Sequence, residues 1–132
     1  MENLEIVKGM YDAAAKADFP AFLGAMDAAI VWNEAENFPY ADRNPYIGPQ
    51  AVAEGVFGRI FADWEYWTLS DLEFHETKDD MIIVTGRYNA KNNATGKIIK
   101  AQVTHMWRLK DGKAISFQQY ADTYPVNKAM VN

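Results

Sequence analysis

The second half of the sequence most constrains the fold, because apolar and polar residues alternate through four consecutive stretches. The pattern predicts strands over residues 68–76, 81–90, 97–109 and 113–122. The connections between them are short, and the last, Asp111-Gly112, is typical of a two-residue hairpin turn. Strands joined so closely run antiparallel, so we expect a four-stranded meander.

In the first half, apolar residues recur at steps of three and four, as they do in amphipathic helices. This spacing predicts a helix over 3–16, a short second helix capped by Asp18 and a third over 49–64. The run 28–34 is too short for a helix and contains adjacent β-branched residues, so it predicts a strand. Residues 36–49, which include three prolines, predict a long loop.

The predicted order of elements is therefore α-α-β-α-β-β-β-β, which is typical of an α+β fold with helices on one face of a mostly antiparallel sheet. The 132 residues, 49% of them hydrophobic, suffice for one core. We find no internal repeat and no linker-like segment, so we expect a single domain over residues 1–132.

Composition excludes several classes of function. A formal net charge of -5 provides no basic face for a phosphate backbone, so we expect no nucleic-acid partner. The chain has no cysteine, no metal-ligand spacing and no glycine-rich phosphate loop, so we expect no metal and no cofactor. Neither an export signal nor a long apolar run occurs, which predicts a cytoplasmic protein without a membrane partner.

Two residues stand out as candidates for acid/base chemistry. On the third strand of the meander, alternation places His105 on the same side as Trp107, and an imidazole in an apolar wall can take and give a proton. A structural histidine bonded to a neighbouring strand is the alternative. Glu34 ends the first strand beside Trp32, where partial burial would raise its pKa; otherwise it is a surface residue.

Four Trp and seven Tyr are more than a core requires and indicate a small-molecule pocket. Tyr88 and Tyr46 could donate hydrogen bonds to a developing enolate oxygen, or serve only in packing. A core role also explains Phe57 and Phe61. The predicted apolar wall consists of Trp32, Phe57, Phe61, Trp64 and Trp107.

Three stretches resemble the SnoaL-like, ketosteroid-isomerase-related proteins of the nuclear-transport-factor-2-like superfamily. They are residues 32–52, residues 86–97 and, most specifically, the stretch from His105-Met106-Trp107-Arg108 to Thr123. The resemblance implies a cone-shaped α+β barrel, in which a strongly curved, mostly antiparallel sheet wraps around helices. It also implies a mouth that admits a small hydrophobic molecule, and a homodimer formed through the outer face of the sheet.

The resemblance also suggests roles for two carboxylates. Polyketide cyclases of this type use an aspartate near the end of the last strand, which matches Asp122, and ketosteroid isomerases place a carboxylate base near the position of Glu34. Alternation from Phe117, however, directs Gln119 inward and Asp122 outward unless a bulge resets the phase. Both residues therefore stay candidates, Asp122 for catalysis and Gln119 for substrate binding.

Members of this superfamily include isomerases, polyketide cyclases, epoxide hydrolases, dehydratases and proteins without catalysis, so the reaction does not follow from the fold. Three hypotheses result: a cofactor-free acid/base enzyme acting on a small apolar carbonyl compound, a binding module without catalysis, and a dimeric scaffold. The enzyme hypothesis expects His105 and an acid close together across an open cavity. The scaffold hypothesis expects a cavity filled by its own side chains.

Overall fold

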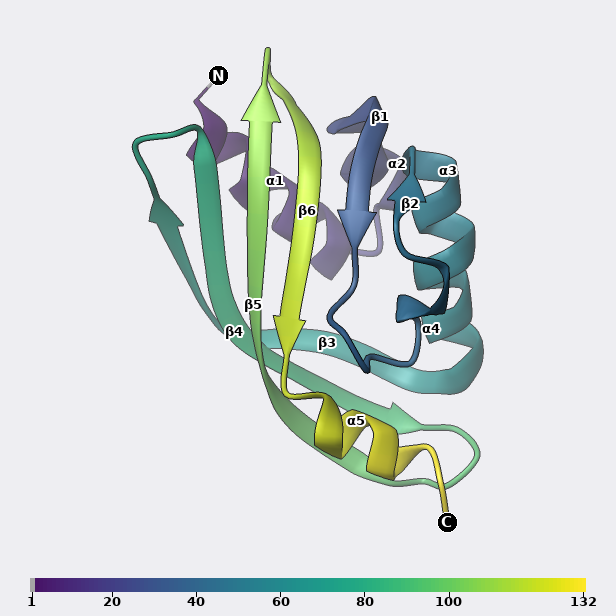
Figure 1. Cartoon of the computed structure of the whole chain (residues 1–132). Coiled ribbons are helices and arrows are strands. Elements are labelled where there is room, and N and C mark those ends of the chain that lie inside the picture. The colour runs from purple at the N-terminus through teal and green to yellow at the C-terminus, as the bar shows by residue number, and fades with distance from the viewer. Residues whose placement is uncertain (1) are drawn as a thin grey trace.

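The computed structural model describes residues 2–132 and has six strands in one curved sheet (Figure 1). The strands are β1 (Met26–Asn33), β2 (Tyr46–Ile47), β3 (Trp64–Glu76), β4 (Met81–Asn92), β5 (Ile98–Lys110) and β6 (Lys113–Ala121). The helices are α1 (Asn3–Ala15), α2 (Phe19–Gly24), α3 (Pro49–Val52), α4 (Gly58–Asp63) and α5 (Thr123–Ala129). A 3-10 turn, Ala41–Arg43, and a π-helical turn, Ala53–Phe57, complete the described elements.

The sheet has the order β2-β1-β6-β5-β4-β3. The expected meander is confirmed, since β3, β4, β5 and β6 pair antiparallel in sequence, whereas β1 joins β6 in parallel. The long strands bend strongly beneath the helices, but the sheet does not close, because β2 and β3 remain at its two edges (Figure 1). The α+β prediction is therefore confirmed, with an open curved sheet in place of a complete barrel.

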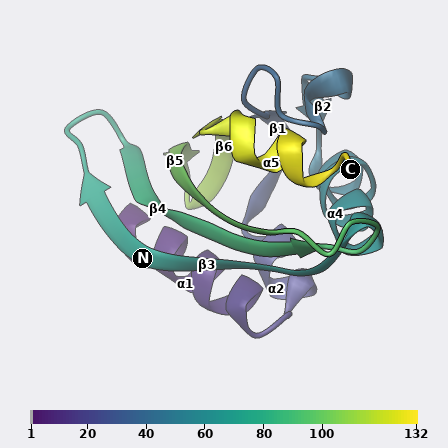
Figure 2. The same ribbon diagram turned by 90° about the horizontal axis from the view of Figure 1, so that it is seen from below.

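The helices cover the concave interior from different sides. α1 contacts β3 and β4, and α5 contacts β5; in the view from below, α5 lies near β5 and β6, far from α1 (Figure 2). Asp18 caps α2 as predicted, its carboxylate accepting a hydrogen bond from the Ala21 amide at 3.2 Å. Within residues 2–132, the structure contains no helix with the length and apolarity needed to span a lipid bilayer.

The third predicted helix differs from expectation in two places. It ends at Asp63, and Trp64 already has extended dihedral angles, so the aromatic residues that follow begin β3 rather than prolong the helix. A π-helical turn also interrupts it. Gly55 lies in this turn, where an added Cβ would collide with the Tyr46 ring. Glycine therefore allows the Tyr46 ring to pack directly against the helix backbone.

Two short elements were not predicted. β2 forms within the proline-containing loop, where Val31 pairs with Ile47 and Trp32 with Tyr46. α5 follows β6 directly, and its residues Val126 and Ala129 are buried. Both elements owe their position to contacts with distant strands, which local sequence does not reveal.

Candidate functional site

A histidine between two tyrosines forms the centre of the buried polar network. His105 lies on β5 and is only 6% exposed, because the alternation of β5 directs it to the concave side with Trp107. The Tyr11 hydroxyl, from α1, lies 2.5 Å from its Nδ1 atom, and the Tyr88 hydroxyl, from β4, lies 2.7 Å from its Nε2 atom. Both ring nitrogens are thus engaged by protein groups.

Each tyrosine oxygen also accepts a hydrogen bond from a second buried side chain. The Trp107 indole N–H donates to Tyr11 at 2.9 Å, and the Gln119 amide nitrogen donates to Tyr88 at 2.7 Å. The other end of Gln119, its Oε1 atom, accepts from the backbone N–H of Ala35 at 3.0 Å. The network therefore joins α1, three strands and the segment after β1.

Burial determines the protonation state of this network. It lowers the pKa of His105 to about 3, so the imidazole stays neutral at physiological pH. Burial likewise raises the pKa of both Tyr11 and Tyr88 above the usual range, which keeps their hydroxyls protonated. His105 consequently orients the hydroxyls of Tyr11 and Tyr88 and carries no positive charge near neutral pH.

Glu34 is the buried carboxyl group of the interior. It follows β1 directly and is 3% exposed, and its Oε2 atom accepts a hydrogen bond from the Trp32 indole N–H at 3.0 Å. Asn44 holds its backbone on both sides, donating to the Glu34 carbonyl at 2.8 Å and accepting from its N–H at 3.0 Å. Among residues 2–132, no hydrogen bond reaches the other carboxyl oxygen, Oε1. This oxygen is therefore not fully buried, because no fully buried side-chain oxygen in this part of the chain lacks a partner.

Burial raises the pKa of Glu34 to about 8, although the Trp32 hydrogen bond and the charge of Arg59 both act to lower it. A carboxyl group with this pKa exists in both protonation states near neutral pH. It can therefore take a proton from a bound molecule and return it, which an ordinary surface glutamate does poorly.

These two shifted groups predict a characteristic dependence of stability on pH. As pH rises from 4.5 towards 8, the unfolded chain releases the Glu34 proton that the folded chain retains, so folding weakens by about 1.4 kcal/mol per pH unit. As pH falls from 6.5 towards 3, His105 is protonated in the unfolded chain but stays neutral in the folded chain. The free energy of unfolding therefore falls at a similar rate. The two slopes cancel between about pH 4.5 and 6.5.

The free energy of unfolding of the wild type, measured with urea, is thus expected to be constant between about pH 4.5 and 6.5 and to fall at both lower and higher pH. Glu34→Gln should remove the decline above pH 6.5 and leave the acid decline in place, because His105 is unchanged. The control is His75→Gln, at an exposed histidine whose ring nitrogen lies 3.8 Å from Glu73. This variant should change neither the acid nor the alkaline decline in stability. An alkaline decline of equal slope in wild type and Glu34→Gln would contradict this assignment.

The loop 35–45 covers the interior and is held by tyrosine hydrogen bonds. The Tyr46 hydroxyl donates to the backbone carbonyl of Tyr40 at 2.5 Å, and the Tyr40 hydroxyl donates to Asp63 at 2.6 Å. The Trp64 indole N–H donates to the Tyr40 hydroxyl oxygen at 3.1 Å. Arg59 reaches the same loop through Asp42 at 2.9 Å. Tyr46 and Trp64 are thus buried as expected, but their polar atoms hold this loop.

The structure does not bring Asp122 to the interior. Residues Val103 to Trp107 of β5 pair one by one with Ala121 to Phe117 of β6, without a bulge, so simple alternation holds over this part of β6. Gln119 is therefore buried at 2% exposure, whereas Asp122 is exposed just before α5. Of the predicted wall residues, Trp32, Trp64 and Trp107 are buried, Phe57 is half-buried and Phe61 is 52% exposed.

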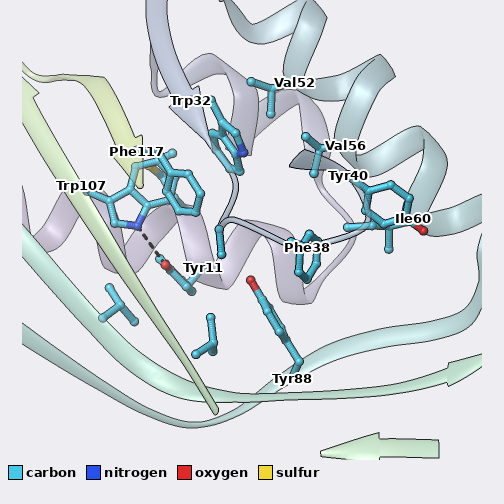
Figure 3. Close-up of a cluster of buried hydrophobic side chains, with 14 of the residues drawn as sticks. Tyr11, Trp32, Phe38, Tyr40, Val52, Val56, Ile60, Tyr88, Trp107 and Phe117 are labelled. Atoms are coloured by element: carbon cyan, nitrogen blue, oxygen red, sulfur yellow. Dashed lines mark hydrogen bonds between the residues drawn. The ribbon is translucent and has the colours of Figure 1, made fainter. Parts of the chain in front are cut away.

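Aromatic side chains fill the space around the network. The Trp32 and Phe117 rings stack with centroids 3.7 Å apart, and Trp107 packs against both (Figure 3). Two hollows of about 390 and 550 Å³ lie elsewhere: one on β3, β4 and β5 around Asp71 and Arg87, the other beside the start of α1. The rings of Trp32, Trp107 and Phe117 are thus closely packed in the interior.

Sequence reasoning missed three contributors to the site. Tyr11 lies within the helix predicted over 3–16, where a hydroxyl-bearing residue at an apolar position is the available signal. Phe38 lies on the loop 35–45 and contacts Tyr88, with ring centroids 6.4 Å apart. Asn44 holds Glu34 across ten residues, and no local pattern indicates this contact. Within residues 2–132, no cluster of three His, Asp or Glu residues suits a metal ion.

Comparison with known proteins agrees with this architecture. An NTF2-like protein from Burkholderia thailandensis is 32% identical, covers 100% of this chain and 99% of its own, and superposes with a TM-score of 0.93. TerC, co-crystallized with polyporic acid, is 21% identical over 97% of both chains, with a TM-score of 0.85. A Pseudomonas putida protein named as a polyketide cyclase is 14% identical over 99% of both chains, with a TM-score of 0.84.

None of the curated proteins matches the sequence. The family model described as the SnoaL-like domain, however, matches residues 7–117, which is most of the chain and includes β1, β3, β4, β5 and nearly all the buried network. The chain therefore belongs to the SnoaL-like domain family and has the NTF2-like fold.

Proposed function

We propose that this protein is a cofactor-free acid/base enzyme that acts on a small, mostly apolar carbonyl compound, with Glu34 as the group that moves the proton. The observation that carries the proposal is a buried carboxyl group with a pKa of about 8 and one oxygen without a protein partner. A general base works best when its pKa lies near the operating pH. Abstraction of a proton next to a carbonyl is the reaction class that fits such a group.

The aromatic interior supports an apolar ligand. Trp32 and Tyr88 come from different strands and, with Phe38, point towards a common centre (Figure 3). Phe38 contacts both Tyr88 and Trp67, so a ligand that reaches Tyr88 must displace the Phe38 ring. Structural neighbours named as a polyketide cyclase and as TerC with polyporic acid support a small organic ligand.

Within this proposal His105 is a positioning residue. The two tyrosines occupy both of its ring nitrogens, and the neutral ring has a pKa of about 3. It therefore holds the hydroxyls in place while Glu34 exchanges the proton. Asp122 has no part in the reaction, because its side chain is exposed beyond the end of β6.

A binding module or scaffold without catalysis is the second candidate, favoured by the closely packed interior, in which Trp32 and Phe117 stack at 3.7 Å. In that case Glu34 and the tyrosine network serve only to hold the loop and the sheet together. The homodimer and the cytoplasmic location expected from the sequence stay predictions.

Proton exchange into a simple ketone distinguishes the two candidates. Acetophenone in D₂O exchanges its methyl hydrogens slowly, and ¹H NMR follows the loss of the methyl signal. We expect the protein to accelerate this exchange about a thousandfold over buffer at pH 8, within the usual range of general acid–base catalysis. Exchange at the buffer rate, with acetophenone bound, would favour the binding module; absence of binding would favour the scaffold.

A further inference from the structure

The middle of the loop that covers the interior is joined to the rest of the protein by side chains. Its backbone hydrogen bonds are local, each from an N–H to the carbonyl three residues earlier: Phe38 to Ala35, Ala41 to Phe38 and Asn44 to Ala41. Within the described part of the chain, no strand pairs with residues 38–43. This segment can therefore move as a unit without breaking a hydrogen bond of the sheet.

Two residues of α4, one helical turn apart, fasten the segment. Arg59 binds the Asp42 carboxylate with both terminal nitrogens, at 2.9 Å each, and its guanidinium lies over the Tyr40 ring, 4.8 Å from the centroid. Further along α4, Asp63 accepts a hydrogen bond from the Tyr40 hydroxyl at 2.6 Å. Residues four apart on a helix share one face, so α4 presents one fixed surface to the loop.

The two ends of the segment are anchored separately. The Asn37 carbonyl accepts a hydrogen bond from the Asn127 side chain of α5 at 2.7 Å, and Asn37 has a positive φ of 70°, a conformation that asparagine tolerates. At the other end, Asn44 is bonded to both sides of the Glu34 backbone. Anchored loop residues of this kind are suited to act as hinges, because they absorb the change in backbone angles when the residues between them move.

Phe38 is the part of the segment that fills the interior. It is 3% exposed, and its ring lies between those of Tyr40 and Tyr88, with centroids 5.8 and 6.4 Å away (Figure 3). Its third aromatic neighbour is Trp67, at 5.9 Å. Because Phe38 precedes Tyr40 by only two residues, a movement that separates Tyr40 from α4 also withdraws the Phe38 ring.

We propose that residues 38–43 form a latched cover over the interior, that the Arg59–Asp42 ion pair is its latch, and that a ligand enters when release of the latch withdraws Phe38. Asp42 is exposed and Arg59 is half-buried, so dissolved ions screen their attraction. Access to the interior therefore increases with ionic strength. Entry of a ligand rests on the function proposed above, whereas release of the latch does not.

The first test uses the wild type without a ligand. The Trp64 indole N–H donates to the Tyr40 hydroxyl oxygen, so it meets water when Tyr40 leaves α4, whereas the indole N–H of Trp107 donates to Tyr11 and reports on the rest of the interior. From 0.1 to 1 M NaCl the Debye length falls from about 10 to about 3 Å. We expect exchange of the Trp64 hydrogen with D₂O, followed by ¹⁵N NMR, to become about twofold faster relative to that of Trp107. An unchanged ratio would overturn the latch.

Matched neutral variants identify the ion pair. Asp42→Asn should speed the relative exchange of the Trp64 hydrogen about threefold, the effect of a well-formed exposed pair, and should abolish its response to salt. Asp71→Asn is the control, because Asp71 pairs with Lys100 at 3.9 Å on the sheet, away from the loop. It should retain the wild-type rate and salt response. Equal acceleration in the two variants would contradict the proposal.

A thiol at position 38 tests whether this residue moves with the latch. The chain has no cysteine, so Phe38→Cys introduces its only thiol, which uncharged N-ethylmaleimide labels when the position is exposed. Adding Asp42→Asn should raise the labelling rate about threefold, whereas Val84→Cys, at a residue 1% exposed on β4, should be labelled equally with and without Asp42→Asn. Acceleration at both positions would mean general unfolding and would overturn a separate cover. The indole measurement decides the latch even if Phe38→Cys does not fold.

Acetophenone tests whether the latch controls entry. Its association rate constant, measured by stopped-flow tryptophan fluorescence, should be about threefold larger in Asp42→Asn than in the wild type and unchanged in Asp71→Asn, because binding requires the open state. Equal rates in the wild type and Asp42→Asn would overturn the role of the latch in entry and leave the proposed function standing. Absence of binding, with exchange and labelling as expected, would overturn the proposed function and leave the latch.

Discussion

Replacing Glu34 with glutamine is expected to slow the protein-catalysed exchange of acetophenone methyl hydrogens about a thousandfold, within the usual range for removal of a general base. The amide preserves the shape of the side chain and can still face the Trp32 indole, but it cannot accept the substrate proton. Because the pKa of Glu34 is about 8, the wild-type rate should rise with pH as the carboxylate forms and level off above that value.

Glu36→Gln is the matched control for this variant. Glu36 lies two residues further along the same segment and is exposed, so its replacement makes the same chemical change without touching the interior. Its exchange rate and pH profile should equal those of the wild type, as followed by ¹H NMR in D₂O. Equal rates in Glu34→Gln and the wild type would remove Glu34 from catalysis.

Truncation of Trp107 to alanine is expected to cost about 3–5 kcal/mol of unfolding free energy, the usual range for a large buried aromatic side chain. Trp107 is 1% exposed and packs against Phe22, Trp32 and Phe117, so its loss leaves a cavity in the centre of the aromatic cluster. It also removes the indole N–H that donates to Tyr11. Urea unfolding at pH 6 measures the change.

Phe61→Ala is the control for aromatic truncation on the helical side. Phe61 is 52% exposed on α4 and contacts only the rim of the cluster through Phe19 and Phe57, so the change should cost less than about 1 kcal/mol. Similar losses in the two variants would mean that the aromatic interior does not carry the stability of the fold.

Alternation along the strands explains which parts of the site could be predicted. Because successive side chains on a strand face opposite sides, the sequence placed His105 and Trp107 together inside and gave Gln119 an inward phase, and the structure has all three buried. The same rule directed Asp122 outward, and only the resemblance to polyketide cyclases kept it as a candidate. Where local periodicity and analogy disagreed, periodicity gave the observed placement, because β6 has no bulge next to this residue.

Contacts between distant segments could not be predicted in this way. Tyr11 meets His105 across 94 residues, and Asn44 reaches back to Glu34 from a loop with no periodic pattern. The pKa values of His105 and Glu34 depend on burial by several elements at once, so sequence could suggest a raised pKa for Glu34 but not the lowered one of His105. The lowered pKa of His105 changes the roles expected from the sequence, because Glu34 and not His105 is the group that titrates near neutral pH.

The sequence by itself determined the order of the first helices, the first strand and the antiparallel meander, and the inward face of the long strands β5 and β6, since these follow from the periods of apolar residues and from short turns. Only the tertiary structure decided that the sheet stays open, that the loop 35–45 covers the interior and that a tyrosine lies on each side of His105. Hydrogen bonds and desolvation act between groups brought together by folding, and their partners lie far apart along the chain.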